Sequence, residues 1–222
     1  MDYHFNFGLI WRHFDKLTYG LLLSVELAVV SVAIGCVIGL ILALLYTSHG
    51  RIIRTMIALY VEVIRNTPLI LLVYLVFYGL PTIVHLQYDA ATSFVITLSI
   101  YAAAYLIEIF RAGLAAIPRG VIEAGMAVGL TPWQRLVHVR LTTMFRVVLP
   151  SLSNTFLSLF KDTSIAAVIS VPELAYGAHW ISVNTFRTIE AYLVITPMYL
   201  IAGYVILLLL RRLERRFAIR RS

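Results

Sequence analysis

The residues with the most chemical potential include a charged pair inside an apolar segment. Lys161 and Asp162 stand at the middle of residues 150–171, which are otherwise mostly apolar. Charged side chains at membrane depth are costly, and by default they mark a path for polar solutes. Thr163 and Ser164 follow, and their hydroxyls can satisfy backbone groups where a helix loosens. These four residues predict a polar pathway through a membrane rather than bond-making chemistry.

A second interpretation of Lys161 and Asp162 is open. Adjacent residues on a helix do not face each other, so each needs a partner of its own or the helix breaks here. If the expected span is misplaced, the pair instead marks a helix end outside the membrane. A structural ion pair is a further alternative to contact with a transported solute.

The second group of functional candidates lies in the stretch 111–152, which separates two apolar segments and holds five arginines. The stretch predicts two short helices. Pro118 opens the first at its first helical position, where proline loses no needed donor, and Gly129 closes it in the left-handed conformation. Thr131 and Gln134 predict a capping box at the start of the second helix.

The first of these short helices has a flat face with a single acid. Gly120, Glu123, Ala124 and Ala127 are three and four residues apart, so they share one side of the helix. Small residues let another backbone come close. A short helix of this kind between membrane segments is suited to insertion into a groove on a partner protein.

The second apolar segment, residues 55–80, is interrupted by Thr67 and Pro68. Proline removes a backbone hydrogen bond and pushes the preceding residue out of helical space. Glu62 and Arg65 are three residues apart and can pair. Two interpretations have equal weight: a kinked helix with its charged turn at the cytoplasmic surface, or a helix break that lines a transport path.

Composition places these features in a membrane protein. Of the 222 residues, 61% are hydrophobic and 13% are charged, whereas soluble domains are about half apolar and about a quarter charged. We therefore predict an all-α membrane protein embedded in the lipid bilayer, with one transmembrane domain over residues 1–222. The five predicted spans are residues 18–45, 55–80, 91–110, 146–171 and 191–210, with a cytoplasmic loop at 111–142. The first span carries a small-residue packing stripe of Gly35, Gly39 and Ala43.

The distribution of positive charge predicts the orientation. Five spans put the two chain ends on opposite sides of the membrane. With the C-terminus inside, thirteen Lys and Arg are cytoplasmic and three are outside, while Arg65 and Lys161 are at membrane depth. The positive-inside rule therefore predicts a periplasmic N-terminus, a cytoplasmic C-terminus and a cytoplasmic Glu123. The same rule explains the net charge of +7 without a nucleic-acid partner, because no soluble basic domain is present.

Catalytic motifs are missing from the sequence. It has no G-x-x-x-x-G-K-[ST] loop, so the chain does not itself bind ATP in the P-loop manner. It has neither a G-x-S-x-G elbow nor an H-E-x-x-H helix. The six histidines lack the spacing of metal ligands. The sequence therefore predicts no catalytic residue, no metal site and no directly bound cofactor.

The short helix that contains Glu123 resembles a motif of a known protein family. Glu123, Ala124, Gly125 and Gly129 resemble the E-A-A-x-x-x-G loop of ABC importer permeases, with glycine at the third position. The flanking runs are similar to those of polar amino acid permeases of the histidine/glutamine/glutamate type; they are residues 105–114, 65–69, 149–152 and 161–164. The resemblance covers about residues 15–215. Thr142 stands where that family has a proline, which predicts a less rigid entry into the next span.

The resemblance implies a type I-like importer fold and a subunit of the bacterial cytoplasmic membrane. Residues expected to couple to a separate ATPase are Gly120, Glu123, Ala124, Gly125, Ala127 and Gly129. Residues expected on the substrate pathway are Thr67, Pro68, Lys161, Asp162, Thr163 and Ser164. A dimer of a separate ATP-binding subunit would use ATP and Mg²⁺. A second permease chain, identical or paralogous, would complete the path. A periplasmic binding protein would deliver a polar amino acid.

An ATP-independent carrier or channel is the alternative function. It would use Lys161, Asp162 and the broken second segment, and it would not require the short cytoplasmic helix. Uptake into vesicles that lack any nucleotide would favour this alternative. An intramembrane enzyme has no pair of nucleophile and base to support it.

Overall fold

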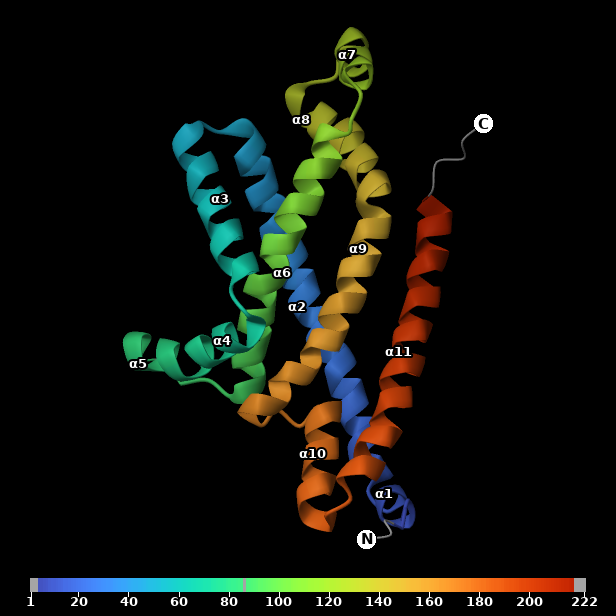
Figure 1. The fold of residues 1–222 in the computed structure, drawn as a ribbon. Coiled ribbons are helices and arrows are strands. Elements are labelled where there is room, and N and C mark those ends of the chain that lie inside the picture. The colour runs from blue at the N-terminus through green and yellow to red at the C-terminus, as the bar shows by residue number, and fades with distance from the viewer. Residues whose placement is uncertain (1–3, 86, 218–222) are drawn as a thin grey trace.

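The fold is a bundle of helices in a computed structural model that describes residues 4–85 and 87–217. Every regular element in that part of the chain is a helix, which confirms the all-α prediction. Five elements run along the bundle (Figure 1): α2 (Phe14–Ser48), α3 (Arg51–Asn66), α6 (Ala90–Ala115), α9 (Thr142–Asp162) and α11 (Thr188–Phe217). Of the predicted basic tail, Arg220 and Arg221 lie outside the described residues.

Shorter elements occupy the ends and one side of the bundle. They are α1 (Gly8–Trp11), α4 (Leu69–Tyr74), the π-helix η1 (Leu75–Gly79), α5 (Leu80–Val84), α7 (Arg119–Ala127), α8 (Pro132–Gln134), the π-helix η2 (Arg135–Leu141), the 3-10 helix η3 (Thr163–Ile169) and α10 (Leu174–Thr185). Helix α7 lies at one end of the bundle, together with the end of α11. Helices α1 and α10 lie at the other end (Figure 1).

Helices α2 and α6 pack through the small-residue stripe predicted from the sequence. Gly35, Gly39 and Ala43 are all buried. A Cβ atom on Gly35 would lie 2.8 Å from the Cβ of Ala102, and one on Gly39 would lie 2.9 Å from the Cβ of Leu106. The two backbones therefore approach as closely as glycine permits, which is the usual way for membrane helices to gain packing energy.

Gly39→Leu is therefore expected to destabilise the protein by about 1–3 kcal/mol. The obstructing atoms are a Cβ and a backbone oxygen of α6, and neither moves by a side-chain rotation. Val37→Leu is the matched control, because Val37 is on the same helix with 61% of its surface exposed. Thermal unfolding of the purified protein in detergent measures the difference. An unchanged midpoint for Gly39→Leu would contradict the predicted close approach.

Helix lengths change the predicted count of spans. In the described part of the chain, three helices are long and apolar enough to cross a membrane, namely Phe14–Ser48, Ala90–Ala115 and Thr188–Arg216. The number rises to four if the bent pair Arg51–Asn66 and Leu69–Val84 is one span. This pair bends by 106° at its break, so the predicted second span at 55–80 is not one straight helix. The predicted fourth span at 146–171 is also interrupted, because α9 ends at Asp162. The count of five is not confirmed.

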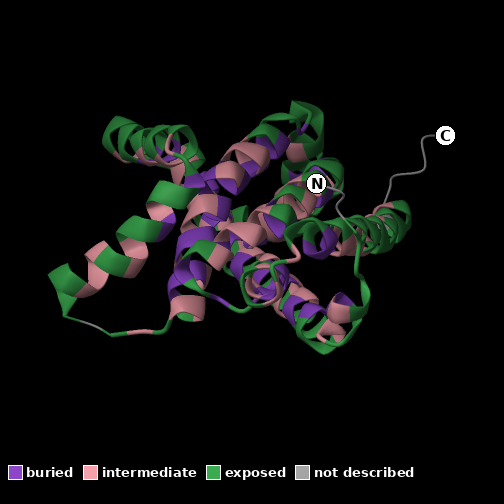
Figure 2. Cartoon of the chain, turned by 60° about the horizontal axis from the view of Figure 1, so that its bottom comes forward, coloured by how far each residue is buried: buried purple, intermediate pink, exposed green. Residues whose placement is uncertain are grey.

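Burial is concentrated in the helices at the centre of the bundle (Figure 2). Phe94, Leu98 and Phe110 of α6 form one cluster with Met144 and Val148 of α9. In contrast, only 6% of the most apolar stretch of α11 is buried within the chain. Its exposed apolar side chains fit contact with lipid or with another subunit.

Candidate functional site: the coupling helix and the polar face of α6 and α9

The residues at both ends fix the extent of helix α7. Pro118 is its N-cap in an extended conformation, one position before the helix begins, whereas the sequence predicted Pro118 at the first helical position. At the other end Gly129 has a φ of 79°. Leu130 N donates to Gly125 O and Gly129 N donates to Met126 O, each at 3.0 Å. These two bonds define a glycine-closed helix end, so the predicted role of Gly129 in ending the helix is confirmed.

Helix α7 exposes the face that the sequence predicted for docking. The exposed members of this face are Gly120, Glu123, Ala124 and Ala127. Gly125 instead is buried, and a Cβ atom there would lie 3.6 Å from the side chains of Arg135 and Leu130, an ordinary contact distance. Gly125 thus belongs to the inner side of α7, and an alanine there would fit without strain.

The second part of the loop is one continuous helix. Gln134 N donates to Thr131 Oγ1 at 3.3 Å and Thr131 N donates to Gln134 Oε1 at 2.8 Å, which confirms the capping box. From Pro132 the chain stays helical through the π-helix η2 into α9. Thr142 Oγ1 donates to Val137 O at 3.1 Å at the junction. The sequence predicted a separate short helix and a loosened entry at Thr142, but the helix runs through this position.

The break between α3 and α4 is built from side-chain hydrogen bonds as well as from Pro68. Thr67 Oγ1 donates to Val63 O at 2.7 Å, and Asn66 Nδ2 donates to Glu62 O at 2.8 Å. Pro68 is extended and caps α4. These bonds satisfy carbonyls that the end of α3 leaves open, so side chains support the sharp turn at this point.

Charged residues near the break pair differently from the prediction. Glu62 and Arg65 form no ion pair in the described part of the chain. Glu62 Oε1 instead accepts from Asn66 Nδ2 at 3.0 Å, and the Arg65 guanidinium lies 5.0 Å from the ring centre of Tyr105. The ring faces the cation, which is a favourable cation–π arrangement.

At the end of α9 the helix tightens at the residues that the sequence singled out. Beyond Asp162 the chain continues as the 3-10 helix η3 and then turns at Ser170, where φ is 63°. Thr163 Oγ1 donates to Phe160 O at 2.7 Å and Ser164 Oγ donates to Lys161 O at 2.9 Å. The predicted use of these hydroxyls to satisfy a loosened backbone is confirmed.

Lys161 and Asp162 do not form an ion pair with each other among the described residues. Lys161 is exposed and Asp162 is half-buried. Asp162 lines a hollow of about 370 Å³ together with Tyr101, Tyr105, Asn154, Thr155, Ser158 and Leu159. The two tyrosine hydroxyls lie 3.0 Å apart. The hollow therefore offers one carboxylate, an amide and several hydroxyls, a lining suited to a small zwitterion or cation with polar groups.

A second hollow lies on the α7 side of the first, between the same two helices. Its volume is about 550 Å³, and its lining includes Arg65, Glu108 and Ser151. Glu108 accepts a hydrogen bond from Arg111 Nη2 at 2.6 Å, so these two residues form an ion pair. The lining residues on each helix recur every three or four positions, so both hollows lie on one face of α6 and α9.

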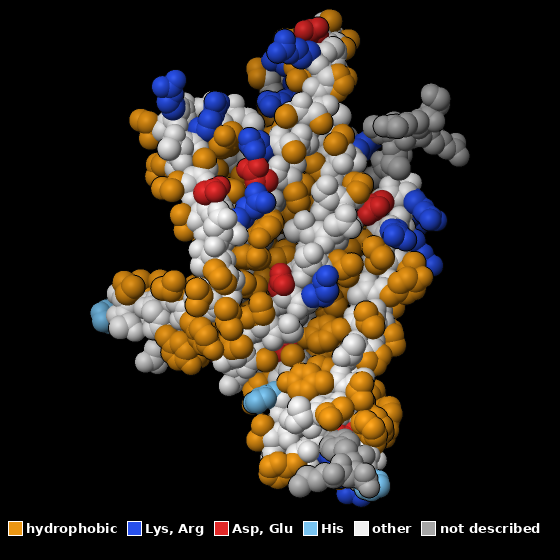
Figure 3. All heavy atoms as spheres, viewed as in Figure 1, with side chains coloured by type: hydrophobic (Ala, Val, Ile, Leu, Met, Phe, Trp, Pro, Cys, Tyr) orange, Lys and Arg blue, Asp and Glu red, His pale blue; other side chains and the backbone are white. Residues whose placement is uncertain are grey.

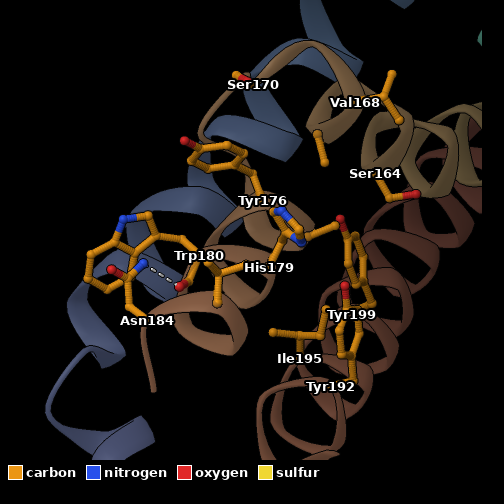
Figure 4. Close-up of a pocket in the computed structure, with 13 residues that line it drawn as sticks. Ser164, Val168, Ser170, Tyr176, His179, Trp180, Asn184, Tyr192, Ile195 and Tyr199 are labelled. Atoms are coloured by element: carbon orange, nitrogen blue, oxygen red, sulfur yellow. Dashed lines mark hydrogen bonds between the residues drawn. The ribbon is translucent and has the colours of Figure 1, made fainter. Parts of the chain in front are cut away.

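A third hollow lies toward the opposite end of the bundle, between η3, α10 and α11, and has a volume of about 800 Å³. Figure 4 shows that His179 of α10 faces it from one side, and Tyr192 and Tyr199 of α11 from the other. Ser164 lines it as well, two residues beyond Asp162. The three hollows thus follow one another along the molecule.

Only part of the predicted substrate pathway lines these hollows. We call the hollow of about 370 Å³ the middle hollow, that of about 550 Å³ on the α7 side the inner hollow, and that of about 800 Å³ the outer hollow. Asp162 lines the middle hollow and Ser164 lines the outer hollow. The other predicted residues, Thr67, Pro68, Lys161 and Thr163, line none of the three. Sequence analysis missed Tyr101 and the polar residues of α9. The signal was the four-residue spacing of Asn154, Ser158 and Asp162, which places them on one side of the helix.

A buried carboxylate at the end of the bundle with α10 was also missed. Glu173 is fully buried and caps α10, accepting from Tyr176 N at 2.7 Å and Ala175 N at 2.9 Å. Tyr199 of α11 donates to it at 2.8 Å and Ser24 of α2 at 3.2 Å. A Cβ atom on Gly20 would come within 2.8 Å of the Glu173 backbone. Glu173 therefore ties three helices together.

The described residues contain no group of three or more His, Cys, Asp or Glu that could hold a metal ion. The site consists of an exposed short helix, α7, and a row of hollows within a bundle of apolar helices. Such an arrangement defines a class of protein: a membrane-embedded subunit that offers a path for a polar solute and a contact surface for a partner.

Comparisons with known proteins agree with this class. The chain matches the family described as the binding-protein-dependent transport system inner membrane component over residues 35–219. It is similar to the glutamine transport system permease protein GlnP of Escherichia coli (strain K12), with 35% identity covering 97% of this chain and 99% of that protein. It is also similar to the L-cystine transport system permease protein TcyB of Bacillus subtilis (strain 168), with 36% identity covering 90% of this chain and 86% of that protein.

Solved structures give the same result. A crystal structure of an amino acid ABC transporter with histidines has a TM-score of 0.86 and 30% identity, covering 96% of this chain and 100% of that chain. The MetNI methionine ABC transporter in an inward-facing conformation has a TM-score of 0.77 at 22% identity, a likeness of fold alone.

The chain belongs to the family of binding-protein-dependent transport system inner membrane components. Within it, the chain is a polar amino acid ABC permease, as the sequence resemblance predicted. It is a multi-pass inner-membrane protein and a transport subunit rather than a catalytic enzyme. Membership also implies association with an ATP-binding subunit and with a permease partner.

Proposed function

We propose that this permease carries a polar amino acid across the inner membrane, driven by ATP and Mg²⁺ in a separate ATP-binding subunit. A periplasmic amino acid-binding protein would deliver the substrate. The family description and the glutamine and L-cystine systems of the relatives support this proposal. Glutamine is our first candidate substrate and L-cystine the second, after these two relatives. L-arginine is the third, because the arginine transport system permease protein ArtQ of Bacillus subtilis (strain 168) is also similar.

The observation that carries the proposal is the polar face of α6 and α9. Tyr101, Tyr105, Asn154, Ser158 and Asp162 line a hollow between α6 and α9. Contact of these groups with lipid would be unfavourable, because the bilayer core offers no hydrogen bonds. A second permease chain, identical or paralogous, therefore covers this face in the working transporter. The row of hollows then becomes half of a pathway that closes on the partner.

The exposed face of α7 supports a role in coupling to the ATP-binding subunit. Glu123 is its only acid, and Gly120, Ala124 and Ala127 keep the face flat. Helix α7 is joined to α6 on one side and through η2 to α9 on the other. A displacement of α7 is therefore applied directly to both helices that line the middle hollow. Gly125 and Gly129 act by shaping α7 rather than by contacting the partner.

The orientation that we propose has a periplasmic N-terminus and a cytoplasmic C-terminus. On the face drawn in Figure 3, Lys and Arg side chains gather over the end with α3 and α7 and over the last turns of α11. Arg12, Lys16 and Arg187 lie near the opposite end, in or beside α1, α2 and α11. The positive-inside rule therefore supports a cytoplasmic location for α7.

Asp162→Asn is expected to reduce ATP-driven uptake by about 10-fold or more, because a charged hydrogen bond to the substrate's α-ammonium group is lost. Insertion is expected to be normal, since Asp162 has no ion-pair partner in the described part of the chain. The measurement is uptake of labelled L-glutamine, L-cystine and L-arginine into proteoliposomes that contain the ATP-binding subunit and the binding protein.

Lys161→Gln is the matched control for Asp162→Asn, because Lys161 is adjacent and exposed but lines none of the hollows. Normal uptake by the Asp162 variant would remove this carboxylate from the pathway. Uptake of equal rate without any nucleotide would overturn the ATP-driven function and favour a carrier or channel.

A further inference from the structure

Arg65 is an exposed cation with no carboxylate partner in the described part of the chain. It is the last residue but one of α3, about 21 Å along the helix from Arg51. Its guanidinium rests over the ring of Tyr105 at 5.0 Å. The carboxylate of Glu62 on the same helix accepts from Asn66 Nδ2 at 3.0 Å. A guanidinium without a carboxylate partner is available to pair with an anion that reaches it.

The second carboxylate near Arg65 is also occupied. Glu108 lines the same inner hollow, but its Oε2 accepts from Arg111 Nη2 at 2.6 Å. Arg65 is exposed within this arrangement. An anion that enters the inner hollow would therefore find the Arg65 guanidinium without competition from a fixed salt bridge.

Arg65 also stands where two hollows meet. It lines the inner hollow, and Tyr105 beneath it lines the middle hollow together with Asp162. A solute that moves from the middle hollow toward α7 thus passes from a carboxylate to a guanidinium. An α-amino acid carries the complementary pair of groups, an ammonium and a carboxylate.

We propose that Arg65 binds the α-carboxylate of the amino acid as it passes from the middle to the inner hollow. This inference rests on the proposed function of the polar face. The guanidinium presents a planar fork of donors that matches a carboxylate, whereas a lysine would offer only a point charge. The Tyr105 ring holds the guanidinium plane and leaves its donors free. The subsite selects α-amino acids over amines that lack the carboxylate.

The test measures equilibrium binding to the purified complex of permease and ATP-binding subunit, without the binding protein. The probes are labelled L-glutamine, L-arginine and L-cystine, each beside a carboxyl-free counterpart: L-glutaminol, agmatine and cystamine. Arg65→Gln is expected to weaken binding of the amino acid by about 10-fold or more, the scale of one lost charged hydrogen bond. Binding of the carboxyl-free counterpart is expected to change less than about 2-fold. The affinity of the Arg65→Lys variant for the amino acid should lie between that of Arg65→Gln and that of the unmodified protein.

Arg54→Gln is the matched control, because Arg54 is also on α3 and also stacks on a tyrosine, Tyr46, at 5.4 Å. Arg54 lines none of the three hollows, so Arg54→Gln should leave the binding of the amino acid and of its carboxyl-free counterpart unchanged. An equal loss for the amino acid and its counterpart would make Arg65 a structural brace and overturn the proposal. No loss in Arg65→Gln, or no binding of any probe by the unmodified complex, would overturn it as well.

The two proposals fail in different ways. ATP-driven uptake by the unmodified transporter tests the function and does not depend on Arg65. If uptake is present and sensitive to Asp162→Asn while Arg65→Gln binds both ligand kinds normally, the carboxylate subsite is wrong and the function stands. If the unmodified transporter shows no ATP-driven uptake, the function itself is wrong.

Discussion

A Gly120→Trp permease is expected to fold and insert normally but to lose about 30-fold or more of its affinity for the ATP-binding subunit. The first part follows from the open space at this position, since a Cβ atom on Gly120 would meet nothing within 4 Å. The second part follows because the indole would stand on the flat face of α7 and keep the partner's groove at a distance. Disrupting one central contact of an interface costs about 2 kcal/mol or more.

Gly50→Trp is the matched control for Gly120→Trp. A Cβ atom on Gly50 would likewise meet nothing within 4 Å, and Gly50 lies before α3 at the same end of the bundle. Co-purification with the ATP-binding subunit and ATP-driven uptake are the two measurements. If Gly120→Trp assembles and transports like the unmodified permease, the exposed face of α7 is not the coupling surface.

Glu173→Ala is expected to lower the stability of the permease by about 3 kcal/mol or more. The carboxylate accepts hydrogen bonds from Ala175 N, Tyr176 N, the Tyr199 hydroxyl and the Ser24 hydroxyl. Each buried donor left without a partner costs about 1–3 kcal/mol. The loss corresponds to a fall of about 6 °C or more in the thermal midpoint for a chain of this size.

Glu26→Ala separates the loss of buried bonds from the loss of a charge, because Glu26 is exposed on α2. Glu173→Gln preserves the size of the side chain but turns an amide donor toward groups that are themselves donors, so it should be intermediate. Thermal unfolding in detergent measures all three variants. A midpoint for Glu173→Ala equal to that of Glu26→Ala would mean that the carboxylate does not hold α10 to α2 and α11.

Glu173 holds together the helices that form the walls of the outer hollow. Helix α10 and η3 form two walls of the outer hollow, and Ser164 and Tyr199 both line it. Glu173 links α10 to Tyr199 and to Ser24 of α2. The outer hollow is therefore framed by helices that are fixed to one another. The inner hollow, in contrast, lies between α3, α6 and α9, and α7 is joined directly to α6 and α9.

Features set by short-range geometry were predictable from the sequence. Gly129 ends α7, and the capping box begins at Thr131, because each depends on residues within one turn of the chain. The stripe of Gly35 and Gly39 was predictable for the same reason, since its four-residue spacing marks one side of a helix. The low content of charge was sufficient to predict a helical membrane protein.

Other features depend on which helices become neighbours, and only the tertiary structure decides that. Proline predicts an interruption at Pro68, but the bend of 106° is set by how α4 packs against the bundle. The predicted pairing of Glu62 with Arg65 fails because Tyr105, forty residues away, presents its ring to the guanidinium. Beyond Asp162 the chain continues as the 3-10 helix η3 and turns at Ser170 toward α10. This course also depends on which helices become neighbours.

The sequence by itself determined the class of protein, the short helix closed by Gly129 and the presence of an acid in an apolar segment, because composition, caps and spacing act over a few residues. The tertiary structure decided that Asp162 joins two tyrosines of α6 in one hollow, and that Glu173 accepts a hydrogen bond from Ser24, 149 residues away along the chain. The physical reason is that a polar side chain in an apolar bundle is stable only where distant segments supply its partners, and no local pattern encodes which segments those are.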